Sequence, residues 1–213
     1  MVLASASLAA AAVTAVPDLV PARDRTLPVD EALAELLPEA GLLRGRVIGC
    51  SGPAAWSLAL ALVSKAVEAG SWLAAVGVPT LGLDAAAEFG VPLSRLVMVD
   101  TDASTPVWAE RVAAAADGFE LIVTSPPTGA ERVVRKVRQR VQARGAVLVA
   151  VGLATPGVAC DLELSTTDVT WVGIGQGTGH LTCRRVTVQL AGRRAPRPVA
   201  RELLLPGPGG RLA

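Results

Sequence analysis

Short apolar runs that do not alternate with polar residues recur along the chain between Val47 and Val151. A strand with one solvated face alternates apolar and polar residues, whereas a strand covered on both faces is apolar throughout. We therefore predict a mostly parallel sheet with helices on both faces. Its strands are expected at Val47–Cys50, Trp72–Val78, Leu96–Val99, Phe119–Val123 and Ala146–Val151.

Helical patterns lie between these runs, which makes the chain an α/β protein. Helices are predicted at Ala55–Ala69, Asp84–Phe89, Thr105–Ala116 and Gly129–Arg144. Asp30 can cap a further short helix through Leu37, which Pro38 stops. The first of the four is apolar on nearly all sides, so we expect it to be buried.

The pattern changes after Gly152, where tight turns replace helices. Strands are predicted at Cys160–Ser165, Val169–Val172, Leu181–Leu190 and Val199–Leu205. They would extend the sheet with antiparallel strands. We interpret the alternating glycines Gly173, Gly175, Gly177 and Gly179 as a hairpin turn, because a dinucleotide-binding loop precedes a helix.

These patterns divide the chain into three parts. Residues 1–27 form an N-terminal helix, over residues 2–15, and a proline-containing linker. Residues 28–191 form the α/β domain. Residues 192–213 are rich in Arg, Pro and Gly, with one edge strand and a mobile tail from Pro206 to Ala213.

The composition is typical of one globular domain, and its charged residues are distributed unevenly along the chain. The 213 residues are 51% hydrophobic and 18% charged, with a net charge of +1. Residues 1–124 carry seven basic and fourteen acidic side chains, whereas residues 125–213 carry thirteen and five. This asymmetry indicates a polyanion or acidic partner near the C-terminal half, or simply a dipolar protein.

Cysteine usage and the N-terminal segment predict a cytoplasmic protein. Cys50, Cys160 and Cys183 are widely spaced, odd in number and without zinc-ligand spacing, so reduced thiols are expected. The apolar segment 1–16 has no basic residue before Arg23, which favours a packed helix over a signal peptide, with export as the alternative. No other segment is long and apolar enough to suggest membrane spans.

The turn after the first predicted strand has the position of a phosphate-binding loop but lacks its residues. Such a loop has a second glycine, a lysine and a hydroxyl residue at fixed spacing from the first glycine. Counted from Gly52, these places hold Ser57, Leu58 and Ala59, and Pro53 follows the first glycine. Trp56 would also crowd the loop. The lysine that contacts phosphate and the hydroxyl that holds magnesium are therefore missing.

Several segments resemble the RecA recombinase superfamily. They are the Ser51–Pro53 turn, the passage from Leu83 to Leu96, and the late strand containing Arg184–Val188. In their order over residues 28–205, the segments resemble more closely the shortened actinobacterial form of the ImuA family, called ImuA-prime. The resemblance implies a RecA-like core and action with ImuB, a polymerase-like protein, and with an error-prone polymerase in damage-induced mutagenesis.

The departures from RecA point to lost catalysis. No acidic residue occurs between Trp72 and Leu83, where RecA has its catalytic glutamate, and Ile122–Ser125 lacks the magnesium-side aspartate. The segments Ser125–Thr128 and Gly152–Ala159 are too short for its DNA loops. We therefore expect no catalytic residue, cofactor or metal.

Other polar residues have structural explanations. His180 is the single histidine and has no nucleophile or acid at suitable spacing. Cys50 is expected to be a small core residue rather than a nucleophile. Asp100 and Asp102 follow a strand at the edge where α/β sheets bind ligands, but a solvated turn is the favoured interpretation.

Candidate contact residues lie late in the chain. Arg135, Arg138 and Arg140 lie on a basic helix that could attract DNA or an acidic tail, or could simply be solvated. Arg193, Arg194 and Arg197 form a basic connector before an edge strand that could accept a partner's strand. Its residues Leu203, Leu204 and Leu205 either contact that partner or fill the core. In the first case, removing residues 192–213 would leave a folded domain.

The function expected from these features is that of a non-catalytic adaptor in DNA-damage tolerance and translesion synthesis. Its partner is expected to be an ImuB-like polymerase homologue, within an assembly that includes an error-prone polymerase and possible contact with RecA. DNA binding is expected to be weak or indirect and sensitive to salt. The alternatives are an ATP-binding ATPase or switch with an atypical loop, and an inhibitor that caps filaments of a recombinase or a division protein.

Overall fold

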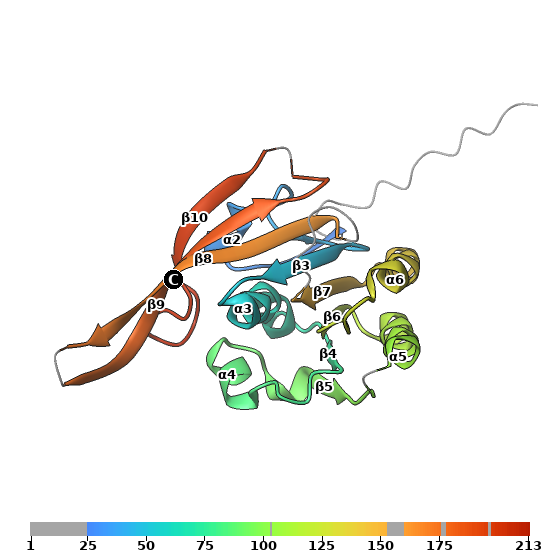
Figure 1. Ribbon diagram of the computed structural model, residues 1–213, viewed down its shortest axis with the longest axis horizontal. Coiled ribbons are helices and arrows are strands. Elements are labelled where there is room, and N and C mark those ends of the chain that lie inside the picture. Colours follow the sequence, from blue (N-terminus) through green and yellow to red (C-terminus); the bar gives the residue numbers. More distant parts are fainter. Residues whose placement is uncertain (1–24, 103, 153–159, 176–177, 196) are drawn as a thin grey trace, which may run out of the picture.

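The computed structural model describes residues 25–102, 104–152, 160–175, 178–195 and 197–213. Its main element is an eight-stranded sheet with the strand order β10-β9-β8-β3-β7-β6-β4-β5 (Figure 1). The expected fold class, a mostly parallel sheet that ends in antiparallel strands and is flanked by helices, is confirmed. The predicted helix over residues 2–15 lies outside the described residues.

The central strands are parallel and almost wholly buried. They are β3 (Val47–Ser51), β4 (Leu73–Val76), β5 (Leu96–Val99), β6 (Leu121–Thr124) and β7 (Val147–Val151). All residues of β4, β6 and β7 are buried, as non-alternating apolar runs predict. Only β5, at the sheet edge, is largely accessible.

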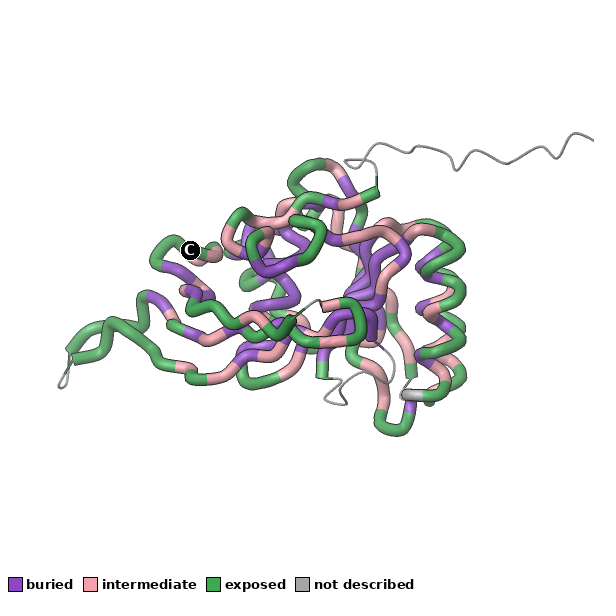
Figure 2. Tube along the Cα trace, turned by 90° about the horizontal axis from the view of Figure 1, so that it is seen from above, coloured by how far each residue is buried: buried purple, intermediate pink, exposed green. Residues whose placement is uncertain are grey.

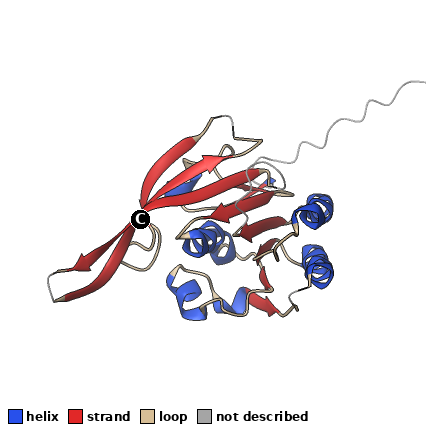
Figure 3. Ribbon diagram, in the orientation of Figure 1, coloured by secondary structure: helices blue, strands red, loops and turns tan. Residues whose placement is uncertain are grey.

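Helices cover both faces of the sheet, as predicted (Figure 3). One face carries α3 (Ala55–Glu68) and α4 (Leu83–Glu88). The other carries α5 (Thr105–Gly118) and α6 (Glu131–Arg144). Two separate hydrophobic clusters result: one surrounds Leu58 and Leu62 of α3, and the other surrounds Trp108 of α5 and Val134 of α6.

A small N-terminal unit extends the first cluster. Strands β1 (Thr26–Leu27) and β2 (Leu42–Leu43) pair antiparallel and enclose α2 (Glu31–Ala34). Asp30 caps α2 as predicted, with its carboxylate accepting the Ala32 N–H at 3.2 Å. The α-helix ends before Leu37, earlier than predicted. The β1–β2 ladder was not predicted, because two-residue strands leave no periodic signal.

The antiparallel part contains three strands rather than the predicted four. They are β8 (Leu162–Ile174), β9 (Gly179–Ala191) and β10 (Val199–Leu204). The two strands expected at Cys160–Ser165 and Val169–Val172 are one strand with an irregularity. Asp168 has a φ of 51°, and the pairing with β9 shifts register between Thr167 and Thr170. A β-bulge therefore replaces the predicted turn.

The predicted hairpin between β8 and β9 is confirmed. The Gly175 N–H donates to the Thr178 carbonyl at 2.8 Å, which closes the turn. Gly173 and Gly179 have φ angles of +111° and +104°, conformations that favour glycine. The remaining glycine of the run, Gly177, lies outside the described residues.

The C-terminal segment folds onto the domain, so the prediction of a mobile tail from Pro206 was wrong. Ala213 exchanges two backbone hydrogen bonds with Leu204, at 2.7 and 3.1 Å. Arg211 forms an ion pair with Glu68 of α3 at 2.6 Å. Leu205 is fully buried in the cluster that contains α3. Residues 192–213 therefore share the core of the preceding domain.

Candidate functional site

The loop after β3 turns sharply against the neighbouring strand β8. Gly52 has a φ of +90°, and a Cβ atom placed on it would lie 2.2 Å from the Thr166 carbonyl oxygen. Only glycine fits this backbone conformation and this close approach. In place of an open cradle, the loop at Gly52 is closed by the backbone of β8.

The Thr166 side chain fixes the same loop. Its hydroxyl accepts the Ala54 N–H at 2.9 Å and donates to the Ser51 carbonyl at 3.1 Å. Thr166 is only 1% exposed. A phosphate loop presents free backbone N–H groups to its ligand, and the N–H of Ala54 is already satisfied from within the chain.

The residues at the lysine and hydroxyl positions point into the core. Leu58 and Ala59 are completely buried. Pro53 is exposed at the loop tip, and Ser57 accepts a 2.6 Å hydrogen bond from Arg184 of β9. The sequence-predicted residues of the degenerate loop therefore lie together, and the Ser57 hydroxyl and the Ala54 N–H are both engaged by protein atoms.

A pocket of about 250 Å³ lies beside this loop, between α3 and α4. Trp56, Leu60, Leu81 and Phe89 form much of its wall, and its polar contribution comes from residues such as Ser57 and Thr80. No charged side chain lines it. The pocket therefore offers apolar contact rather than a site for a phosphate or a metal ion.

The strand end expected to lack a magnesium-binding aspartate carries Thr124. Its hydroxyl accepts the indole N–H of Trp108 at 2.7 Å and donates to the Val76 carbonyl at 2.8 Å. Thr124 is fully buried. Its side chain thus joins α5, β4 and β6 and contributes to packing.

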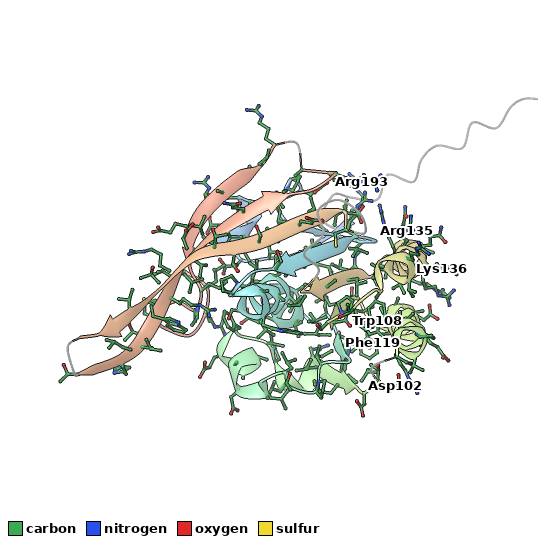
Figure 4. The ribbon with its side chains drawn as sticks, in the orientation of Figure 1. Asp102, Trp108, Phe119, Arg135, Lys136 and Arg193 are labelled. Carbon is green, nitrogen blue, oxygen red and sulfur yellow. The ribbon has the colours of Figure 1, made fainter. Side chains whose placement is uncertain are left out.

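A second pocket, of about 350 Å³, lies at the carboxyl ends of these strands. Its wall includes Asp102 and Trp108, which Figure 4 labels. Asp102 accepts hydrogen bonds from the Ser104 hydroxyl at 2.6 Å and the Ser104 N–H at 3.0 Å. These bonds lower the pKa of Asp102 below its usual value. The carboxylate of Asp102 stabilises an exposed turn, in agreement with the solvated turn that the sequence favoured.

Among the described residues, no group of three His, Cys, Asp or Glu side chains lies close enough together to hold a metal ion.

The basic helix α6 has fewer free cations than its sequence suggested. Arg138 bonds Asp161 and Arg140 bonds Asp117, each at 2.6 Å. Arg135 and Lys136 are exposed on the outer surface of α6 (Figure 4). Two of the three predicted contact arginines are therefore engaged in ion pairs within the domain.

Asp161 is the centre of a charge cluster that the sequence did not reveal. Its carboxylate is 1% exposed and accepts the Val47 N–H at 3.1 Å. Besides Arg138, it pairs with Arg194 at 3.3 Å and Arg46 at 3.8 Å. Arg194, expected in a partner contact, thus helps to hold the connector against β3 and α6, while Arg193 and Arg197 are exposed.

The predicted contact residues of the last strand are mostly internal. Leu203 is 8% exposed, Leu205 is fully buried, and Leu204 is partly buried. Ala213 also pairs with the backbone at Leu204. Of the two interpretations that the sequence left open for Leu203 and Leu205, partner contact is wrong and the second holds: these side chains fill the core.

The β8–β9 hairpin forms a feature that the sequence reasoning missed. Beyond Thr167 it projects from the domain as a two-stranded ribbon with mainly exposed residues (Figure 2). We call residues 169–175 and 178–183 the arm. Trp171, Val172, Ile174 and Leu181 are 45, 40, 67 and 46% exposed. The available signal was the complete lack of Asp, Glu, Lys and Arg from Val169 to Cys183.

Arg184 holds the base of the arm in place. Its guanidinium lies over the Trp171 ring, 5.0 Å from the ring centroid, and Nε donates to the Leu205 carbonyl at 2.7 Å. Together with the bond to Ser57, these contacts tie β9 to α3, β8 and the C-terminal segment. Burial lowers the pKa of Arg184.

The cysteines and the histidine provide no nucleophilic site. Cys50, Cys160 and Cys183 are unpaired and buried. Burial raises the pKa of the Cys50 thiol far above its usual range and that of Cys160 to about 12. His180 is exposed on the arm. Cys50 is therefore a core residue, as predicted.

None of the described helices combines the length and the apolar character that are needed to cross a bilayer.

Comparison with known proteins places the chain in a family. Over 127 residues, 60% of the chain, it is 36% identical to a Mycobacterium tuberculosis protein named only as the uncharacterised protein Rv3395c. The match spans 52% of that relative's length, so the chain covers about half of it. Residues 35–157, which run from the end of α2 past β7, match the model of a family described as the MT3502 N-terminal domain. The chain belongs to the MT3502 N-terminal domain family.

Proposed function

We propose that this protein is a non-catalytic adaptor in DNA-damage tolerance, which binds a polymerase-like partner during translesion synthesis. One observation carries the proposal: Thr166 closes the loop at Gly52, at the place where a related ATPase would hold phosphate. The fold thus retains its sheet and helices, while the polar groups of this loop serve packing.

The choice of pathway rests on the resemblance to ImuA-prime. The mostly parallel sheet with an antiparallel end agrees with a RecA-like core. Leu58 and Ala59 occupy the lysine and hydroxyl positions of a phosphate loop, and both are buried in the core, which agrees with a protein that does not bind phosphate there. The partner expected from the resemblance is an ImuB-like polymerase homologue, acting with an error-prone polymerase in the cytoplasm.

Direct DNA binding has a minor place in this proposal. Arg138, Arg140 and Arg194 are engaged in ion pairs within the domain. The exposed cations that remain near them are Arg132, Arg135 and Lys136 on α6 and Arg193 and Arg197 on the connector. Because affinity for DNA scales with the number of phosphates neutralised, such a surface supports only weak, salt-sensitive contact.

The proposal is tested by co-purification and by a mutagenesis assay. The tagged full-length chain, expressed in its own host after DNA damage, is expected to retain the polymerase-like partner. Deletion of its gene should lower damage-induced mutation without lowering spontaneous mutation. A chain that retains no polymerase-like protein, with unchanged induced mutation in the deletion strain, would contradict the proposal.

A further inference from the structure

We propose that the arm is the element that docks the partner, and that it binds an uncharged, apolar surface of a polypeptide. This inference rests on the adaptor function proposed above and assigns it a surface. The surface differs from the basic helix and the last strand, to which the sequence had pointed.

Exposure and charge define the chemistry of the arm. Ile174 is 67% exposed near its tip, and Trp171 and Leu181 are exposed by nearly half. No Asp, Glu, Lys or Arg occurs from Val169 to Cys183, although 18% of the chain is charged. Exposed apolar side chains on a strand that lacks charged residues mark a contact site, since charges normally protect exposed strands.

The backbone of the arm is also available for pairing. Strand β8 pairs with β3 only as far as Ser165, and β9 pairs with β10 only from Arg185 onward. Between these points, the two strands of the arm pair only with each other in the part of the chain that is described. A two-stranded ribbon alone is marginally stable in water, so a third strand or an apolar surface would stabilise it.

The base of the arm is organised before any partner binds. Arg184 bonds Ser57 and Leu205 and stacks on Trp171, which fixes where the ribbon leaves the domain. A preorganised element loses less conformational entropy on association than a flexible one. The arm therefore combines exposed apolar side chains with a base that is fixed to the domain.

Charge excludes nucleic acid as the favoured occupant. A two-stranded ribbon fits the major groove of DNA, but binding there depends on basic side chains that contact phosphates. The arginines nearest to the arm lie at its base, where Arg184 is tied to the domain and Arg185 pairs with Glu202 at 3.1 Å. An uncharged polypeptide surface is the complementary partner.

The test compares an arm variant with a matched control. Ile174→Thr with Leu181→Thr removes apolar surface from the arm and keeps residues suited to strands. Met98→Thr is the control, since Met98 is 41% exposed on the distant edge strand β5. Binding of each full-length chain to the purified ImuB-like homologue is measured by calorimetry, and folding is checked by thermal melting.

We expect the double variant to bind about tenfold more weakly, a difference of about 1.4 kcal/mol, and the control to bind like the wild type. Binding of the wild type should also persist at about 1 M salt, where charge interactions are screened within about 3 Å. If the double variant melts early, Ile174→Thr alone replaces it, and the same weakening in smaller degree is expected.

The remaining outcomes separate the two proposals. A wild-type chain that binds no ImuB-like homologue overturns the proposed function and the inference with it. Equal binding by the arm variant and the wild type, or loss of wild-type binding at high salt, overturns the inference alone. A wild-type dimer that the arm substitutions convert to a monomer would make a second copy the occupant, which also overturns it.

Discussion

The hydroxyl of Thr166 accepts a hydrogen bond from the backbone N–H of Ala54 at 2.9 Å, across the gap between β8 and the loop after β3. This bond uses a donor that a phosphate loop would present to its ligand. The loop thus joins β3 to the antiparallel part of the sheet. At the position where a phosphate loop would bind its ligand, this loop therefore makes a contact within the domain.

Gly52 should be the most sensitive residue of this loop. Gly52→Ala places a methyl group against the Thr166 carbonyl and forces a φ of +90° on an L-residue. We expect a loss of about 3 kcal/mol in the free energy of unfolding, measured in urea. Gly118→Ala is the control, because Gly118 lies in α5 with open space around it. Equal stability of the two variants would show that the loop is not closed by β8.

The order and type of the central elements could be predicted because burial on both faces leaves a strong pattern. The five strands between Val47 and Val151 and the four helices among them were found within a few residues. The single strand β8 was divided in two because its bulge at Asp168 looks like a turn in sequence. The local sequence pattern cannot show that the segments before and after Asp168 both pair with β9.

The candidate site was harder to predict because its structure depends on contacts between residues that are far apart in the sequence. The sequence shows that Leu58 replaces the lysine of a phosphate loop. It does not show that Thr166, more than a hundred residues away, closes the loop. The arginines of α6 looked free in sequence, whereas Asp161 and Asp117 engage two of them. Leu205 looked like an edge residue and is buried, because the segment after it folds back.

Asp161 should be a major contributor to stability. Asp161→Asn leaves the guanidinium groups of Arg138 and Arg46 without their buried carboxylate. Removing one partner of a buried ion pair costs about 3 kcal/mol or more. Asp168→Asn, at an exposed position where asparagine tolerates the positive φ, should change stability by less than about 0.5 kcal/mol. Urea unfolding of both variants provides the comparison, and a stable Asp161→Asn chain would refute the assigned role.

Acid should weaken the contact between α5 and α6. The hydrogen bond from Arg140, with the charges of Arg140 and Arg144, holds the pKa of Asp117 below its usual value. A lowered pKa in the folded state means that this stabilisation is present above about pH 4 and is lost as the pH falls through the folded pKa. Asp117→Asn should remove this part of the acid dependence, measured as unfolding midpoints from pH 7 to low pH. Parallel profiles for both chains would contradict the assignment.

The C-terminal segment should be required for folding. Leu205→Ala creates a cavity at a fully buried site and should cost about 3 kcal/mol, whereas Leu204→Ala, at a partly buried site, should cost about 1 kcal/mol. Removal of residues 192–213 should abolish cooperative melting, because β10 and Leu205 leave with it. A truncated chain that melts cooperatively near the wild-type temperature would restore the earlier expectation of a dispensable tail.

The central claim is that the protein binds a polymerase-like partner without using a nucleotide. Calorimetric titration of the full-length chain with the purified ImuB-like homologue, with and without saturating MgATP, tests it directly. We predict a saturable complex with the same dissociation constant in both conditions, and no heat when MgATP alone is titrated into the chain. A complex that forms only with MgATP, or no complex in either condition, would contradict the account.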